Sequence, residues 1–357
     1  MGFRLDPGVG PNSTSPSHGA GATPGECRVR PLLRRCDKKG WEKRKVEARL
    51  QIFSGSSNPR LAAEIVGCLG VPGGRATVGT FEDGETRIRL EENVRGSDVF
   101  VIQSLCAPSD HHIMELLLMI DAVRRSSASR VTAVIPYMAY AKQEKKTQSR
   151  EPISAKVLAN VITRGGADRI LAVDLHSPAI EGFFDIPVDH LRAGGILANY
   201  FERLDLSDVV VVSPDTGGVA RANEFRERLG ASLAIIYRQR RDQESSRKLE
   251  MVGEVKGKTA IVVDDMISTG NTLLMATEAL LEKGATEVYA CATHGIFADD
   301  ALEAIERSPI KRVVVTNTIP IQREAASTKL EVLSVGPLVA ESILRIHKDI
   351  SLSSLFI

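Results

Sequence analysis

The sequence predicts an α/β protein built of two stacked domains, each with a mainly parallel sheet and helices on both faces. Three observations support this fold class. Short runs of Val and Ile alternate with amphipathic helical stretches from Leu50 onward. Aromatic residues make up only 4% of the chain, and the aliphatic remainder of its apolar content suits buried parallel strands. A length of 357 residues exceeds one typical domain and accommodates two.

The strands are expected at the β-branched runs, which span residues 98–103, 131–136, 170–174, 209–213, 259–263, 287–292 and 312–316. The helices are expected between them, at residues 111–125, 154–163, 193–203, 219–229 and 272–283. Because the strands come in two sets, we expect a first domain over residues 49–194 and a second over residues 195–357. Connections between parallel neighbours should be right-handed.

Residues 1–48 differ in composition from the rest of the chain. Pro, Gly and Ser dominate as far as Gly25, and a basic run follows at residues 34–39. The segment has no apolar core of the kind that a secretory signal needs. An organellar transit peptide, a disordered extension and a wrongly chosen start codon remain open as explanations. We expect a cytoplasmic protein unless this segment directs it to an organelle.

Charge and hydropathy argue against two classes of partner. The chain has 46 Lys and Arg against 45 Asp and Glu, which leaves a net charge of +1. Such a balance gives no argument for nucleic acid or an anionic membrane as a partner. No apolar run approaches the length that spans a bilayer. We therefore expect neither nucleic acid nor a membrane as a partner.

The most informative stretch spans residues 260–272, where a β-branched run ends in Asp264 and Asp265. A short loop follows, Ser268-Thr269-Gly270-Asn271-Thr272, and then a helical pattern begins. The backbone N–H groups of such a loop can surround a phosphate, and the two carboxylates can accept hydrogen bonds from neighbouring sugar hydroxyls. The alternative is an ordinary turn with Asp as a helix cap. Capping needs one Asp and no Thr-Gly-Asn-Thr, so we favour a sugar-phosphate site.

Polar side chains also follow three other expected strands, and in parallel sheets ligands collect beyond these strand ends. A basic loop with Lys142, Gln143 and Lys145 follows one strand and could hold a nucleotide base and its phosphates, although a solvated loop would look the same. His176 follows the next strand and could contact a metal or a phosphate. Asp215 follows another and could hold a metal or ribose, or simply cap a helix.

Two further segments have functional and structural interpretations that the sequence leaves open. The polar segment 237–244 carries three arginines, including Arg238 and Arg240, as a mobile loop over a charged transition state would. A surface loop would share this composition. The segment around Phe81, Asp83 and Glu85 contains an Asp-Gly turn. Its Phe could stack on a purine if exposed, or belong to the core beside a hairpin turn.

Several segments together carry a resemblance, in this order along the chain: 81–85, NVRGSDVFVIQ at 93–103, PYMAYAKQEKK at 136–146, 152–155, DLHSPAIEGFFDIPVD at 174–189, 213–218, 264–272 and 293–297. With these segments the chain resembles the ribose-phosphate diphosphokinase family, also called phosphoribosyl-diphosphate synthetases, from about Leu50 to the C-terminus. One such segment would fit any phosphoribosyltransferase. So many in this order are specific to the synthetases.

The resemblance implies two phosphoribosyltransferase-like domains and an enzyme of nucleotide biosynthesis. Its reaction would transfer the β,γ-diphosphoryl group of ATP to the anomeric hydroxyl of ribose 5-phosphate, which gives the 1-diphosphate and AMP. The family further implies Mg²⁺ as cofactor, inorganic phosphate as a common activator, and a homo-oligomer that is often a hexamer. Rival readings are a catalytically silent family member that tunes an active partner, and a phosphoribosyltransferase.

The resemblance also implies a role for each matching residue. Those expected to bind ATP are Phe81, Asp83 and Glu85, which would contact adenine in a neighbouring subunit's site, and Lys142, Gln143 and Lys145. Those expected at the metals are His176 and Asp215. Those expected on ribose 5-phosphate are Asp264 and Asp265 at the hydroxyls and Ser268, Thr269, Gly270, Asn271 and Thr272 at the phosphate. Those expected in the catalytic loop are Arg238 and Arg240.

The chain departs from the usual family pattern at several of these positions, and its phosphate loop begins with Ser268 where the family usually has Asp. The family usually has Lys at the position of Arg238, Arg at that of Lys142, and Gly at that of Asn271. Arg and Lys are not interchangeable where geometry is demanding, but both exchanges keep the charge. Asn tolerates the left-handed conformation that Gly would adopt. We expect altered kinetics or regulation rather than loss of activity.

Overall fold

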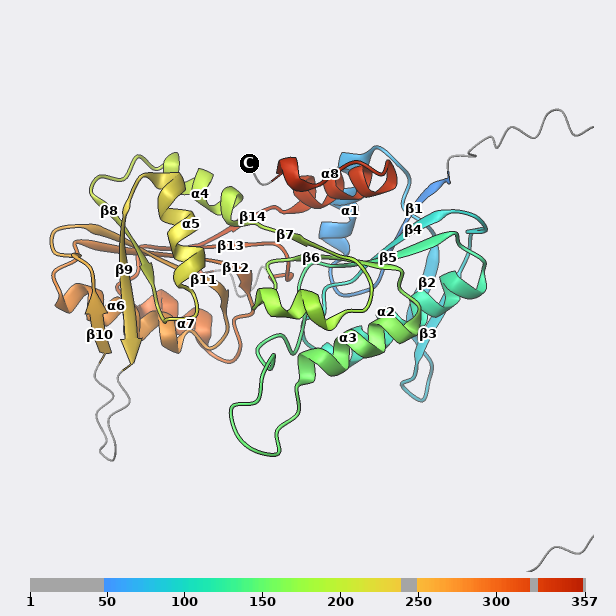
Figure 1. The fold of residues 1–357 in the computed structure, drawn as a ribbon, viewed down its shortest axis with the longest axis horizontal. Helices are drawn as coiled ribbons and strands as arrows, with labels where there is room; N and C mark the ends of the chain where they lie inside the picture. Colours follow the sequence, from blue (N-terminus) through green and yellow to red (C-terminus); the bar gives the residue numbers. More distant parts are fainter. Residues whose placement is uncertain (1–47, 239–248, 322–326, 356–357) are drawn as a thin grey trace, which may run out of the picture. The chain divides into compact units, whose positions relative to one another are not determined.

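The computed structural model describes residues 48–238, 249–321 and 327–355, and they form two open sheets and one hairpin (Figure 1). The first sheet has five parallel strands, in the order β1 (Leu50–Ser54), β4 (Asp98–Ile102), β5 (Arg130–Ile135), β6 (Arg169–Val173) and β7 (Val188–Leu191). The central strands β4, β5 and β6 are almost wholly buried, as expected for a parallel sheet with both faces covered.

The second sheet has seven strands, in the order β10 (Leu249–Val252), β9 (Ser232–Arg238), β8 (Val209–Ser213), β11 (Thr259–Ile267), β12 (Glu287–Gly295), β13 (Arg312–Thr316) and β14 (Leu330–Leu333). All neighbours are parallel except the edge pair, in which β10 runs antiparallel to β9. The α/β fold class with mainly parallel sheets is therefore confirmed.

Helices cover both faces of each sheet. On the first sheet, one face packs against α1 (Pro59–Leu69) and α8 (Gly336–His347), and the other against α2 (Ser109–Arg125) and α3 (Ser154–Gly165). On the second sheet, one face packs against α4 (Gly194–Glu202) and α5 (Val219–Leu229), and the other against α6 (Asn271–Glu282) and α7 (Ala301–Arg307). Among the described residues, no helix is long and apolar enough to cross a membrane.

The predicted elements agree with the structure where the periodicity is strong. Strands β8 and β13 and helix α5 have the expected bounds, and β4, β5 and β6 are shifted by one residue at most at either end. Strand β11 was expected to end at residue 263 but continues to Ile267, so that Asp264 and Asp265 lie inside the strand. The extension is possible because β12 also continues, to Gly295, and pairs with it there.

The segment around the Asp-Gly turn forms a hairpin between β2 (Ala76–Thr80) and β3 (Thr86–Leu90). Gly84 in the turn has a φ of 91°, a conformation that glycine adopts at low cost. Phe81 is 50% exposed, so the alternative of a core Phe at this turn is wrong. Its ring lies near the Arg87 guanidinium, 5.6 Å from ring centroid to Cζ.

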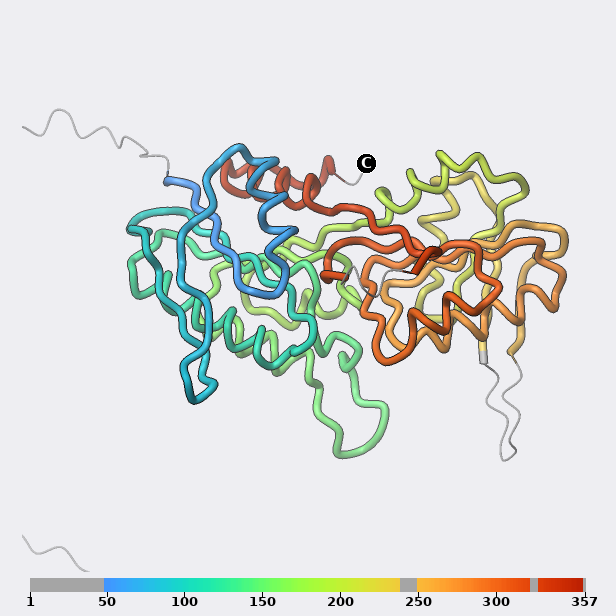
Figure 2. Tube along the Cα trace, turned by 180° about the vertical axis from the view of Figure 1, so that it is seen from behind, coloured from blue at the N-terminus to red at the C-terminus, as the bar shows by residue number. Residues whose placement is uncertain are grey.

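The end of the chain returns to the first sheet. Helix α8 follows the last strand of the second sheet, yet its Val339 and Ile343 share an apolar cluster with Ile52 of the first sheet and Ile65 of α1. Both views show α8 beside α1 (Figures 1 and 2). All strands of the first sheet precede residue 195 and all strands of the second follow it. The domain boundary between residues 194 and 195 stays a prediction.

The packing of α8 gives the first prediction. Ile343 is fully buried, so Ile343→Ala should lower the free energy of unfolding by about 2–5 kcal/mol, because it leaves a cavity in the cluster with α1. The matched control is Ile350→Ala, the same change at a side chain that is 52% exposed, which should cost no more than about 0.5 kcal/mol. Urea unfolding followed by circular dichroism measures both. Equal losses would contradict a core role for α8.

Candidate active site

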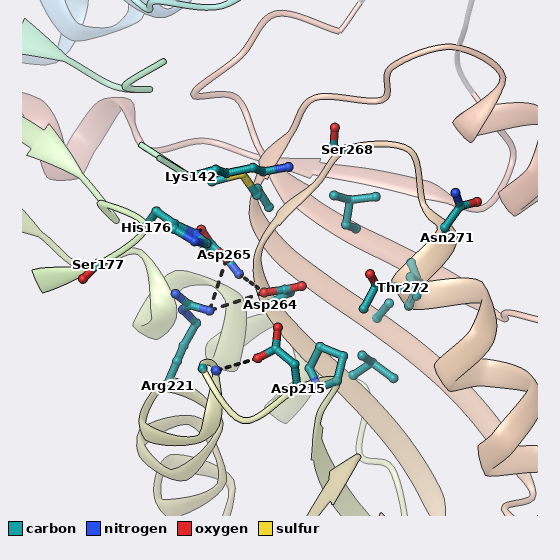
Figure 3. Close-up of a pocket in the computed structure, with 18 of the residues that line it drawn as sticks. Lys142, His176, Ser177, Asp215, Arg221, Asp264, Asp265, Ser268, Asn271 and Thr272 are labelled. Atoms are coloured by element: carbon teal, nitrogen blue, oxygen red, sulfur yellow. Dashed lines mark hydrogen bonds and ion pairs between the residues drawn. The ribbon is translucent and has the colours of Figure 1, made fainter. Parts of the chain in front are cut away.

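A cavity of about 680 Å³ lies where strand ends from both sheets meet (Figure 3). The residues singled out from the sequence that line it are Lys142, Lys145, His176, Asp215, Asp264, Asp265, Ser268, Thr269, Gly270, Asn271 and Thr272. They come from the loops after β5, β6 and β8, from the end of β11 with its following loop, and from the start of α6. The expected convergence of consecutive strand ends on one pocket is therefore present.

The cavity lies at the point in the second sheet where the direction of strand order reverses. Strands β8 and β11 are neighbours there, and the helices that follow them, α5 and α6, cover opposite faces. Crevices of this kind are where open α/β sheets bind ligands. The pairing of β11 with β8 ends at Val262, so Asp264 and Asp265 extend beyond it toward the cavity.

The two adjacent carboxylates are held by His176 and Arg221, which come from different elements. The His176 Nδ1 atom lies 2.7 Å from Asp265 Oδ2, and Arg221 Nη1 lies 3.5 Å from Asp264 Oδ1 and 3.4 Å from Asp265 Oδ1 (Figure 3). The side chain of Asp265 is 4% exposed, whereas that of Asp264 is 25% exposed. Asp264 is thus the carboxylate that a ligand can reach.

The surroundings move the pKa values of these groups in opposite directions. Burial, together with the negative charge of Asp265, raises the pKa of Asp264. Burial also acts to raise the pKa of Asp265, but the hydrogen bond with His176 and the charge of Arg221 lower it overall. The hydrogen bond to Asp265 raises the pKa of His176. Asp265 is therefore the ionised partner of His176, and the charge of Asp264 depends on what enters the cavity.

The loop of residues 268–272 has the geometry of an anion site. Gly270 has a φ of 77° and precedes α6, whose first turn has no side-chain cap. The N–H groups at the start of such a helix lack intrahelical partners and carry partial positive charge, which favours a phosphate. The left-handed residue is Gly270, and Asn271 already begins the helix. Our expectation that Asn271 replaces a left-handed glycine is therefore wrong.

Asp215 both caps a loop and lines the cavity. One of its carboxylate oxygens accepts a hydrogen bond from the Gly218 N–H at 2.8 Å, and the Ser213 hydroxyl donates to its carbonyl at 2.7 Å. The side chain is nevertheless exposed to the cavity (Figure 3). The structural and functional interpretations of Asp215 are thus compatible.

The residues of the basic loop after β5 differ in whether they line the cavity. Lys142 and Lys145 line the cavity, and Lys145 Nζ lies 3.1 Å from the carboxylate of Glu144, which lines it too. Gln143 is not among the described lining residues, and its amide oxygen accepts a hydrogen bond from the Ser154 hydroxyl. A nucleotide contact through Gln143 stays a prediction.

The remaining predicted residues lie elsewhere or outside the described residues. Phe81, Asp83 and Glu85 stand exposed on the β2–β3 hairpin and do not line the cavity. Arg238 is the last residue of β9, and Arg240 lies outside the described residues. Their roles stay predictions.

Sequence reasoning missed Arg221, which contacts both carboxylates, and Glu144. Arg221 lies in the first turn of α5, three residues beyond Gly218. A helix that begins at a ligand-binding loop presents its first turn to that ligand, and this position was the available signal. Its partnership with Asp264 could not be read from the sequence, because the two residues are 43 positions apart.

Comparisons with known proteins give matches over most of the chain. A family described as the N-terminal domain of ribose phosphate pyrophosphokinase matches residues 50–166, and a phosphoribosyl synthetase-associated domain matches residues 245–357. A ribose-phosphate pyrophosphokinase of Caldanaerobacter subterraneus is 54% identical over 308 residues, covering 86% of this chain and 98% of its own. The Bacillus subtilis enzyme of that name is 50% identical over 307 residues, covering 86% and 97%.

A solved structure gives the same result for the fold. The phosphoribosylpyrophosphate synthetase of Mycobacterium smegmatis is 43% identical and superposes with a TM-score of 0.80, covering 84% of this chain and 99% of its own. The two family matches together span more than half of the chain, and the relatives are aligned over almost their whole length. This chain belongs to the ribose-phosphate pyrophosphokinase family.

Proposed function

We propose that this chain transfers the β,γ-diphosphoryl group of ATP to the anomeric hydroxyl of ribose 5-phosphate, which yields 5-phosphoribosyl 1-diphosphate and AMP. The observation that supports it most is that two features line one cavity. They are the start of α6, which has no side-chain cap, and the adjacent carboxylates of Asp264 and Asp265, which Arg221 contacts. Relatives that are named ribose-phosphate pyrophosphokinase align with this chain over almost their whole length.

In this proposal the sugar phosphate binds along the end of β11. The 5-phosphate accepts hydrogen bonds from the N–H groups at the start of α6, within the loop of residues 268–272. The ribose hydroxyls donate to Asp264, the exposed carboxylate of the pair. Asp265 is buried against His176 and Arg221, so it acts mainly by fixing these groups and Asp264 in place. The anomeric carbon then faces the loops that come from the first sheet.

The reaction itself requires alignment and charge neutralisation more than covalent participation by the protein. The oxygen of the anomeric hydroxyl attacks the β-phosphorus and gives up its proton to solvent. The bond from that phosphorus to the α,β-bridging oxygen breaks, and AMP leaves with that oxygen. Lys142 and Lys145 line the cavity and supply positive charge to the triphosphate. Arg238 and Arg240 are proposed to add guanidinium groups from the segment that follows β9.

The residues present fit Mg²⁺ as the cofactor. The described residues hold no cluster of three or more His, Cys, Asp or Glu side chains that could cage a metal by themselves. Magnesium commonly takes one or two protein ligands and completes its shell with phosphate oxygens and water. His176 and Asp215, which both line the cavity, would hold it. Asp265 occupies Nδ1 of His176, so Nε2 would be the metal-binding atom, as in many metal-bound histidines. The ion would neutralise developing phosphate charge.

Other parts of the proposal follow from the family. The exposed hairpin with Phe81, Asp83 and Glu85 would contact adenine in the site of a neighbouring subunit, in a homo-oligomer that is a hexamer by resemblance. Gln143 would help to hold ATP, and inorganic phosphate would act as an activator. Residues 49–194 and 195–357 would form the two domains, and the protein would act in the cytoplasm unless residues 1–48 direct it to an organelle.

The decisive experiment is an assay for AMP. Purified chain with ATP, Mg²⁺ and ribose 5-phosphate should release AMP and form the 1-diphosphate in equal amounts. Chromatography measures both products, with and without inorganic phosphate in the assay. No AMP above a blank without sugar would favour the catalytically silent family member. Use of the preformed diphosphate with a base, and none of ATP, would favour a phosphoribosyltransferase.

A substitution at the reachable carboxylate tests the pentose contact. Asp264→Asn removes a charge-assisted hydrogen bond, so kcat/KM for ribose 5-phosphate should fall about 10- to 160-fold, from about 1.5–3 kcal/mol. The KM for ATP should change much less. The control is Asp121→Asn on α2, whose side chain is 51% exposed and does not line the cavity. Unchanged steady-state kinetics for the sugar in Asp264→Asn would refute this assignment.

Two glycine-to-alanine substitutions, one in the loop of residues 268–272 and one outside it, test whether this loop binds the phosphate. Gly270→Ala places a side chain at a φ of 77°, which costs about 1–2 kcal/mol and should shift the loop away from its phosphate-binding conformation. We expect the KM for ribose 5-phosphate to rise about 5- to 30-fold. Gly257→Ala imposes similar strain at a φ of 75° in a turn before β11 and should leave this KM unchanged. If both variants behaved alike, the loop would not bind the phosphate.

A further inference from the structure

Two buried histidines hold both polar groups of one peptide unit. The carbonyl oxygen of Asp174 lies 3.0 Å from Nε2 of His294, and the N–H of Leu175, in the same peptide plane, donates to Nε2 of His190 at 2.8 Å. His294 belongs to β12 of the second sheet and is 1% exposed, whereas His190 belongs to β7 of the first and its side chain is 4% exposed. One peptide is thus clamped from both sheets.

The hydrogen-bond partners define the form of each ring. A carbonyl can only accept, so Nε2 of His294 carries the hydrogen, and its Nδ1 lies 2.9 Å from the Thr318 hydroxyl. An N–H can only donate, so Nε2 of His190 is the acceptor, and its Nδ1 donates to Glu181 at 2.5 Å. Burial lowers the pKa of both imidazoles, which agrees with two neutral rings of opposite tautomer.

The side chain of Asp174 is anchored as well. Its Oδ2 atom accepts hydrogen bonds from the Thr293 hydroxyl at 2.6 Å and from the Ala193 N–H at 3.0 Å, and the residue is 7% exposed. Its φ of 38° lies in the left-handed region, which costs a non-glycine residue free energy unless the surroundings impose it. The anchored carboxylate and the clamped peptide together impose it here.

The clamp lies one residue from a group of the candidate active site. Leu175 is 3% exposed and packs in the core of the first sheet, and the next residue is His176, whose Nδ1 contacts Asp265 at 2.7 Å. The orientation of the Asp174–Leu175 peptide sets the direction in which the chain leaves β6. A rotation of that peptide would therefore carry the imidazole of His176 away from Asp265.

We propose that His294 and His190 are positioning residues, which clamp the Asp174–Leu175 peptide and thereby hold His176 against Asp265. Neither histidine lines the cavity, so both act through His176. The kinetic consequence rests on the proposed function, but the clamp itself does not. Because one histidine comes from each sheet, the position of His176 also reports whether the two sheets are docked at this point.

A pair of substitutions at His294 separates positioning from packing. In His294→Gln an amide nitrogen can take the place of Nε2 and still donate to the Asp174 carbonyl, whereas in His294→Asn the amide matches Nδ1 and falls short of it. Both remove the imidazole and keep a polar side chain. We expect His294→Asn to raise deuterium uptake in a peptide covering residues 172–178, and His294→Gln to restore most of the protection. Thermal unfolding confirms that both variants are folded.

Activity provides the second measurement. His294→Asn should lower kcat about 10- to 100-fold, because a small misplacement of an active-site group has effects of this size, and His294→Gln should recover most of it. In a His176→Ala background the same His294→Asn change should have almost no further effect on kcat. A purely structural role would instead give additive losses in such a cycle.

The outcomes are distinct. Equal uptake and equal rates in His294→Asn and His294→Gln, or additive losses with His176→Ala, would overturn the proposal. Deuterium uptake needs no substrate, so it tests the clamp even if the wild-type chain released no AMP. If His294→Asn does not fold, His190→Asn and His190→Gln repeat the comparison from β7, since only Gln can place an acceptor at the Leu175 N–H. Equal uptake in that pair would equally overturn the clamp.

Discussion

The contact that most of the site depends on joins the buried carboxylate of Asp265 to His176 and Arg221. A carboxylate this deeply buried is stable in ionised form only when opposite charges and hydrogen bonds compensate for the lost water. His176 comes from the end of β6 in the first sheet, and Arg221 from α5 on the second. The ionised state of Asp265 thus depends on both sheets being in place.

This dependence extends through a polar seam between the two sheets. The Ser104 hydroxyl donates to the Thr318 carbonyl at 2.6 Å, and the Asn58 amide donates to the Asn317 carbonyl at 2.8 Å. His294 and Thr293, which both lie near the end of β12, contact Asp174, two residues before His176. Hydrogen bonds are directional and their buried partners are costly to leave unpaired, so the seam specifies one relative placement of the strand ends.

The two ends of the cavity offer different means of holding an anion. At α6, the N–H groups of an uncapped helix start offer a fixed anion site that needs no charged side chain. At the β5 loop, Lys142 and Lys145 are exposed and long, and one of them already pairs with Glu144. The fixed N–H groups at α6 suit the phosphate of a sugar phosphate. The flexible lysine side chains suit a triphosphate, whose charge distribution changes during transfer.

The sequence by itself determined the fold class, most of the central strands and many of the groups that meet at the cavity. Short β-branched runs that alternate with amphipathic helical stretches indicate a parallel sheet. Such a sheet brings the residues that follow its strands to one edge. For this reason His176, Asp215, Asp264 and Asp265 could be assigned to one site from their positions alone. Short elements with weak periodicity, such as β14 and α7, could not be read in the same way.

Only the tertiary structure decided the contacts between distant residues. It placed Arg221 on the carboxylates, turned Gln143 toward Ser154, assigned the left-handed conformation to Gly270 rather than Asn271, and returned α8 to the first sheet. The physical reason is common to these cases. Local propensity acts over a few residues, whereas the pairing of charges and the covering of an apolar face depend on which elements meet in space.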